Sequence, residues 1–180
     1  MEDVFEKVSA HFIKGMMFHD SMANYYDFLN LRGYKRFHEY QFLCDTKNYR
    51  KLNRYYINHH SRLVSESEFD EPNVIPDSWY RYKREEVDTS TKKNAIETAM
   101  QKYVEWEKET KDLLEKSIKE LYDAGAINDA CFLKKMLKKV SKELKYAERK
   151  KIELSNINYD LDYIMQEQKC IHDKYMEKIK

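Results

Sequence analysis

Residues 65–88, SESEFDEPNVIPDSWYRYKREEVD, decide the topology of this chain because they separate two pairs of helical patterns. Both prolines, Pro72 and Pro76, lie in this segment, and the apolar spacing of three and four residues that marks a helix is absent from it. A connection of this length is unusual in a compact domain, and it is normally functional or required by the topology. In a helical bundle it spans the length of the molecule and makes the next helix parallel to the previous one.

Apolar residues recur at helical spacing on both sides of this crossover, and two glycines mark tight turns. Gly33 is expected to adopt a positive φ at a helix end, and Gly125 closes a later helix. The helices are expected over about 2–30, 34–64, 89–123, 126–154 and 157–177, with the crossover at 65–88, in a single domain of residues 1–180. This order predicts an all-α four-helix bundle with a long crossover loop and a short C-terminal fifth helix.

The composition excludes several classes of protein. With 3 Gly and 2 Pro, the chain lacks the turns of a β-sandwich or barrel and the clustered glycines of a phosphate-binding loop. The formal net charge of +1 favours no nucleic-acid partner. Three cysteines without a CxxC pair indicate reduced thiols and a cytoplasmic protein. No apolar segment approaches the length of a membrane span, so no membrane partner is expected.

Two segments resemble ferritin. Residues 21–52, SMANYYDFLNLRGYKRFHEYQFLCDTKNYRKL, resemble the segment that joins the first two ferritin helices, with one residue inserted near the turn. Residues 108–137, KETKDLLEKSIKELYDAGAINDACFLKKML, resemble the second ferritin hairpin. The resemblance implies a ferritin-like bundle whose copies assemble into a hollow homo-oligomeric cage. It also implies iron as the bound metal, with iron storage and Fe(II) oxidation as the function.

The resemblance also implies where the ligands of a di-iron site would fall. The first-helix Glu of the family falls on Phe12, which offers no ligand atom. The Glu-x-x-His of the second helix becomes Asn48–Lys51, or Asp45–Asn48 one turn earlier. The third-helix Glu falls on Glu107, and the fourth helix offers Val140-Ser141. A conventional di-iron centre is therefore expected to be incomplete.

The apolar patterns independently place a group of polar side chains near the middle of the bundle. The candidate metal ligands are His19, Asp45, Asn48, Glu107 and Glu143. One imidazole and three carboxylates are suitable ligands for a single weakly bound Fe(II), Zn(II) or Mn(II). The alternative interpretation is a hydrogen-bonded polar layer in which His19 is neutral.

The leading hypothesis is an iron-binding, iron-storage cage subunit whose Fe(II) oxidation is weakened, or performed at an unconventional site around Asp45, Glu107 and Glu143. The first alternative is a structural cage or interaction protein that has lost iron oxidation. The second is a nucleic-acid protector resembling the Dps proteins, because Gly33–Glu39 resembles their second-helix start and supplies His38. That alternative uses a basic stripe on the fourth helix, which is ordinarily a solvated face. The stripe consists of Lys135, Lys138, Lys142, Lys145 and Arg149.

Overall fold

The computed structural model describes residues 2–64 and 83–179, so residues 65–82 of the expected crossover, with both prolines, lie outside the described residues. The described chain forms α1 (Glu2–Phe28), α2 (Arg32–His60), the short 3-10 helix η2 (Arg84–Glu86), α3 (Thr89–Asp123), α4 (Ile127–Asn156) and α5 (Leu161–Ile179). Within the described residues these helices are the regular structure, which confirms the all-α class.

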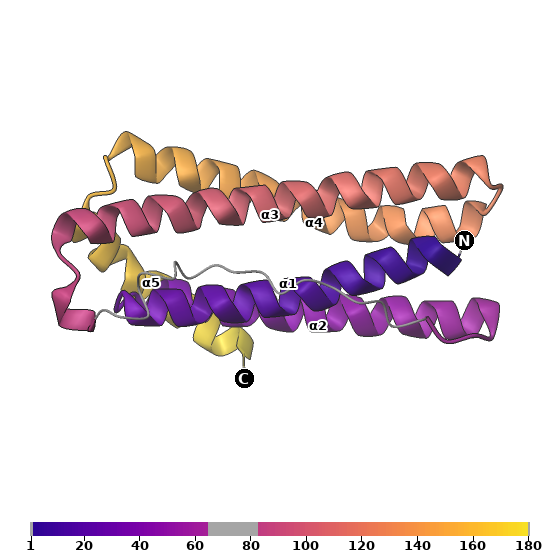
Figure 1. Cartoon of the computed structure of the whole chain (residues 1–180), viewed down its shortest axis with the longest axis horizontal. Helices are drawn as coiled ribbons and strands as arrows, with labels where there is room; N and C mark the ends of the chain where they lie inside the picture. Colours follow the sequence, from indigo (N-terminus) through magenta and orange to yellow (C-terminus); the bar gives the residue numbers. More distant parts are fainter. Residues whose placement is uncertain (1, 65–82, 180) are drawn as a thin grey trace.

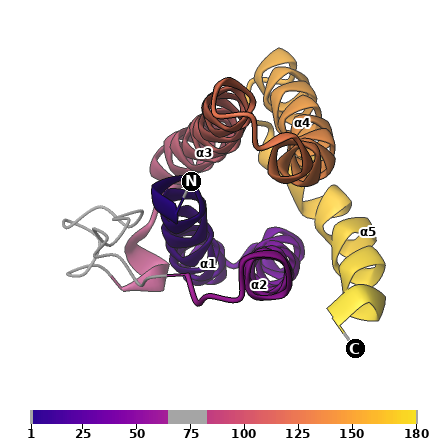
Figure 2. The ribbon, with the colours of Figure 1, turned by 90° about the vertical axis from the view of Figure 1, so that its right-hand side faces the viewer.

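The helices form two antiparallel hairpins, α1–α2 and α3–α4, which lie side by side (Figure 1). α3 begins at the end of the bundle where α2 also begins, so these two helices run in the same direction (Figure 1). Viewed along the bundle, α1 lies between α2 and α3, while α5 leaves the far end of α4 and packs against α2 (Figure 2). The parallel direction of α2 and α3 agrees with the expectation for a long crossover.

The apolar pattern of each helix explains which face it buries. Residues at spacings of three and four on α3 all lie in the interior, from Ala95 through Tyr103 and Trp106 to Leu121. Ile127, the first residue of α4, is 60% exposed and does not contribute to the core. Asp88 caps α3, since its carboxylate accepts a hydrogen bond from the Thr91 amide at 2.7 Å.

The buried apolar residues form two clusters, one toward each end of the bundle. The first cluster includes Tyr26, Phe37 and Tyr103 and extends to α5. The second includes Phe12 and Leu133 and fills the opposite end. Polar side chains separate the two clusters at mid-bundle, and this separation positions the candidate site.

The turn between α1 and α2 corrects the expectation for Gly33. The positive φ of 59° belongs to Asn30, while Gly33 lies inside the first turn of α2. A Cβ atom on Gly33 would lie 2.9 Å from the Cα of Gln168 and would also overlap its carbonyl oxygen. Glycine is therefore required here because α5 passes directly against the α2 backbone. Gly125 does adopt a positive φ, of 72°, between α3 and α4.

We expect Gly33→Ala to lower the free energy of unfolding by about 1–3 kcal/mol, because the added methyl group pushes α5 away from α2. Denaturant titration followed by circular dichroism measures the loss, and amide hydrogen exchange should show that α5 loses protection first. In an open helix interior the same change would stabilise the protein by up to about 1 kcal/mol. A stabilised variant would therefore contradict the packing described here.

Candidate functional site

The polar layer at mid-bundle surrounds a small internal cavity of about 20 Å³, which suffices for one water molecule or a bare cation. It lies between the two apolar clusters, with Trp106 from one and Phe12 and Val140 from the other among its walls. Its polar lining residues are His11, Gln41, Asp45, Asn48, Glu107, Thr110, Lys139 and Glu143. We refer to this space as the central cavity.

Four of the five predicted ligands line the central cavity: Asp45 and Asn48 from α2, Glu107 from α3 and Glu143 from α4. The fifth, His19 of α1, lies behind Asp45, with its Nε2 atom 3.7 Å from Asp45 Oδ2. The structure therefore brings the predicted residues together from four different helices. Within the described residues, however, no group of three or more His, Cys, Asp or Glu side chains has an arrangement that already matches a metal site.

Asp45 is held in the interior by the absence of a side chain on α1. A Cβ atom on Gly15 would overlap Asp45 Oδ2 and would lie 3.0 Å from Trp106. Burial is the main cause that raises the pKa of Asp45 to about 7, and the charge of Glu143 adds to the shift. Lys139 and a hydrogen bond with Asn48 oppose the shift. Gly15 thus gives the carboxylate room to lie where its charge is poorly solvated.

Glu107 is the most deeply buried carboxylate of the cavity, with 6% of the residue exposed. Burial raises its pKa well above the usual value, and the charges of Asp45 and Glu143 add to this effect. Across the cavity, Gln41 Nε2 donates a hydrogen bond to Glu143 Oε2 at 3.1 Å. Three carboxyl groups thus lie close together, and a bound cation would neutralise the negative charge of their ionised forms.

His19 and His38 form a buried pair behind the cavity. Their Nδ1 atoms are 3.0 Å apart, so one ring donates a proton and the other accepts it. Burial lowers the pKa of His19 to about 3 and that of His38 well below its usual value. Both rings are therefore neutral near pH 7, as the hydrogen-bonded alternative for His19 requires. His38 stacks on Tyr26 inside the first cluster, away from the cavity lining.

The cavity fits one cation but not two. A two-metal site places its ions about 3.5–4 Å apart and needs bridging carboxylates on both sides. Phe12, which is 2% exposed, fills one side with a phenyl ring, and Val140 presents another apolar wall. These apolar walls leave no place for two bridged ions.

Sequence reasoning missed three residues of the site. His11 and Lys139 line the cavity, and Gln41 bridges to Glu143. Gln41 lies on the buried face of α2, so a polar residue on an apolar pattern was the signal that could have found it. Lys139 gave no such signal, because it belongs to the run of lysines on α4 and is exposed.

The basic stripe of α4 is exposed along its whole length, at Lys135, Lys138, Lys142, Lys145 and Arg149. This exposure agrees with the interpretation of the stripe as a solvated face.

Among the described helices, none is long and apolar enough to cross a membrane.

No known family model and no curated protein matches the sequence. Solved archaeal ferritins match the fold. An engineered closed form of Archaeoglobus fulgidus ferritin has a TM-score of 0.79 at 16% identity, covering 96% of this chain and 94% of that chain. A humanized archaeal ferritin has a TM-score of 0.80 at 14% identity, with coverage of 96% and 94%. The open-pore ferritin of Archaeoglobus fulgidus has a TM-score of 0.79 at 16% identity, covering 96% of this chain and 95% of that chain. The chain has the ferritin-like fold.

Proposed function

We propose that this ferritin-like chain is a subunit of a self-assembling cage that binds and stores iron, with one weak Fe(II) site in the central cavity. The observation that carries the proposal is the meeting of Asp45, Glu107 and Glu143 from three helices at a buried cavity of about 20 Å³. Carboxylates buried together without enough compensating charge favour a bound divalent cation. Iron is the proposed cargo because the fold is that of ferritins.

The proposed site differs from a two-iron oxidation centre. The phenyl ring of Phe12 and the ammonium group of Lys139 surround the cavity where further acidic ligands would be required. A single Fe(II) can be held there, but oxidation is expected to be slow because no second iron is positioned beside it. The three cysteines, Cys44, Cys131 and Cys170, are free thiols, which supports the proposal of a cytoplasmic protein.

Two measurements test the proposal. Aerobic addition of Fe(II) to the assembled protein should produce particles with an electron-dense core, and light scattering should show a closed oligomer. Anomalous scattering from crystals soaked in Fe(II) should show one ion bounded by Asp45, Glu107 and Glu143. Particles that stay empty, with no ion inside the bundle, would instead support the alternative function, a structural cage without iron oxidation. The apolar residue Phe12 and the cation Lys139 favour that alternative.

We expect Gly15→Ala to weaken Co(II) binding to the central cavity about tenfold, because the new methyl group displaces the Asp45 carboxylate. Optical titration with Co(II) measures the affinity. Gly125→Ala is the control for loss of stability alone, since its φ of 72° strains an alanine while nothing lies within 4 Å of the added Cβ atom and the residue is remote from the cavity. Equal affinities of the Gly15 variant and the parent protein would show that Asp45 is not a ligand in its described position.

A further inference from the structure

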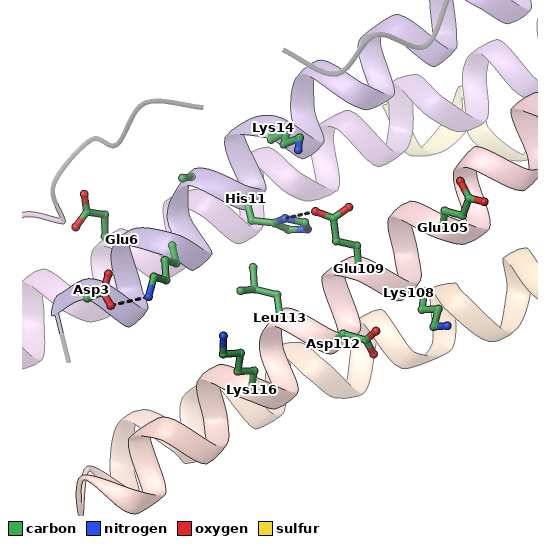
Figure 3. Close-up of a pocket in the computed structure, with 12 residues that line it drawn as sticks. Asp3, Glu6, His11, Lys14, Glu105, Lys108, Glu109, Asp112, Leu113 and Lys116 are labelled. Carbon is green, nitrogen blue, oxygen red and sulfur yellow. Dashed lines mark hydrogen bonds and ion pairs between the residues drawn. The ribbon is translucent and has the colours of Figure 1, made fainter. Parts of the chain in front are cut away.

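His11 separates the central cavity from a large groove on the surface of the bundle. The groove lies between the N-terminal half of α1 and the C-terminal half of α3, and its volume is about 870 Å³ (Figure 3). We call it the α1–α3 groove. His11 contributes to the lining of both the groove and the central cavity. One imidazole ring therefore lies between the groove and the cavity, which also reaches solvent on its α2 and α4 side, where the Asp45 side chain is 15% exposed and Lys139 is exposed.

Three contacts hold the His11 ring in its position between the groove and the cavity. Its ring stacks on Trp106 with centroids 4.4 Å apart and planes inclined by 1°. Its Nε2 atom forms a hydrogen bond of 2.8 Å with Thr110 Oγ1, on the cavity side. Its Nδ1 atom faces the groove, 3.9 Å from Oε1 of Glu109 (Figure 3). The His11 ring thus lies between the Glu109 carboxylate in the groove and Thr110 in the cavity lining.

The electrostatics of the two sides of the cavity differ. On the side of α4, the exposed ammonium group of Lys139 lies at the cavity wall and repels an approaching divalent cation. On the side of the α1–α3 groove, burial and the nearby positive charge of Lys14 lower the pKa of His11 to about 4, so Lys14 is the cation beside an uncharged ring. The carboxylate of Glu109 lies directly outside it. The groove carries both signs of charge, with carboxylates outnumbering lysines.

We propose that the α1–α3 groove is the access route and outer binding site for divalent cations that reach the central cavity, with Glu109 as the outer ligand and His11 as the gate. This inference rests on the proposed function, because it supplies the same buried site. The cation is held first by the Glu109 carboxylate and then passes the His11 ring to reach Asp45 and Glu107.

A gate outside the final site has a kinetic signature. Because Glu109 lies in the groove and outside the final site, changing it alters association and dissociation by the same factor and leaves the equilibrium constant unchanged, whereas Thr110 also lines the cavity. A ligand such as Asp45 instead changes the equilibrium constant. The two roles can therefore be separated in one series of variants.

Stopped-flow absorption with Co(II) as the probe tests the route on the full-length protein. Glu109→Gln should slow both association and dissociation by about three- to tenfold, because the carboxylate that attracts the cation to the gate is lost. Thr110→Val should speed both rates by about two- to tenfold, because it removes the hydrogen bond that holds the gate closed. Asp112→Asn is the matched control, since Asp112 lines the same groove but points away from His11 (Figure 3).

The outcomes distinguish the route from the site. Co(II) binding that depends on Asp45 but has the same rates in the Glu109, Thr110 and parent proteins would overturn the route and leave the proposed site intact. If Lys139→Gln alone raises the association rate tenfold, access lies on the α4 side. This result would also overturn the route and leave the proposed site intact. If Co(II) binding does not depend on Asp45, both the proposed site and its access route are wrong.

Discussion

Replacing Asp45 with asparagine should weaken Co(II) or Fe(II) binding by about 100-fold or more, while making the metal-free protein more stable above neutral pH. The affinity falls because the amide removes one of three negative ligands. The stability rises because the carboxyl group is poorly solvated, as its pKa of about 7 against an ordinary value of 3.8 indicates. Opposite effects on binding and on stability are typical of a residue retained for function.

The pH dependence of the Asp45→Asn variant follows from the same shift. The folded protein binds this proton more tightly than the unfolded chain, so the stabilisation is complete below pH 3.8 and is lost as the pH rises through about 7. Across this window Asp45 contributes a slope of at most about 1.4 kcal/mol per pH unit. His11 and His19 have lowered pKa values and act in the opposite direction, so the parent and variant must be compared.

Urea titrations of both proteins between pH 4 and pH 8 measure this difference. The variant should gain stability relative to the parent as the pH rises. Asp20→Asn serves as the control because Asp20 is an exposed carboxylate on α1. A constant difference across the range would mean that Asp45 is solvated in the folded protein, which would also remove the electrostatic reason for a cation at the site.

Lys150→Ala should lower the free energy of unfolding by about 3–5 kcal/mol, the largest stability loss expected here. Lys150 is buried on α4, and its ammonium group pairs with Glu167 of α5 and, at 3.2 Å, with Glu153. The hydroxyl of Tyr34 on α2 donates to the same Glu167 at 3.0 Å. Removing the lysine leaves a half-buried carboxylate without its counter-ion where α2, α4 and α5 meet.

Denaturant titration measures the loss, and hydrogen exchange should show that α5 becomes unprotected before the other helices. Lys145→Ala on the exposed face of α4 is the matched control and should change stability by less than about 0.5 kcal/mol. The double variant Lys150→Met with Glu167→Gln should recover most of the stability, because neither charge then remains unpaired. A single variant as stable as the Lys145 control would show that the pair is solvated and contributes little.

Much of the fold was predictable because helix formation and burial depend on local spacing. The residues from Ala95 to Leu121 that recur at spacings of three and four form the buried face of α3, and Asp88 caps its first turn. The predicted role of Gly33 was wrong. Glycine is needed at this position because a side chain would collide with Gln168, which is remote in sequence. The helix end needed a positive φ, but Asn30 supplied it.

The candidate site was predictable only in part. The sequence indicated which polar residues lie on buried faces, and His19, Asp45, Asn48, Glu107 and Glu143 do lie at or beside one cavity. It did not indicate His11, whose importance arises from its position between the groove and the cavity. Nor did it single out Lys139 from the other lysines of α4, because its place on the cavity wall depends on where the neighbouring helices lie.

The amino-acid sequence by itself determined that this chain forms long helices in two hairpins and that Phe12 and Val140 are apolar residues on buried helix faces. These properties follow from residue type and helical periodicity, which are local. The tertiary structure alone decided that Gly15 makes room for the Asp45 carboxylate, that His11 lies between the groove and the cavity and that Lys139 borders the cavity. These properties depend on distances between side chains of different helices, and such distances are set by packing across the whole bundle.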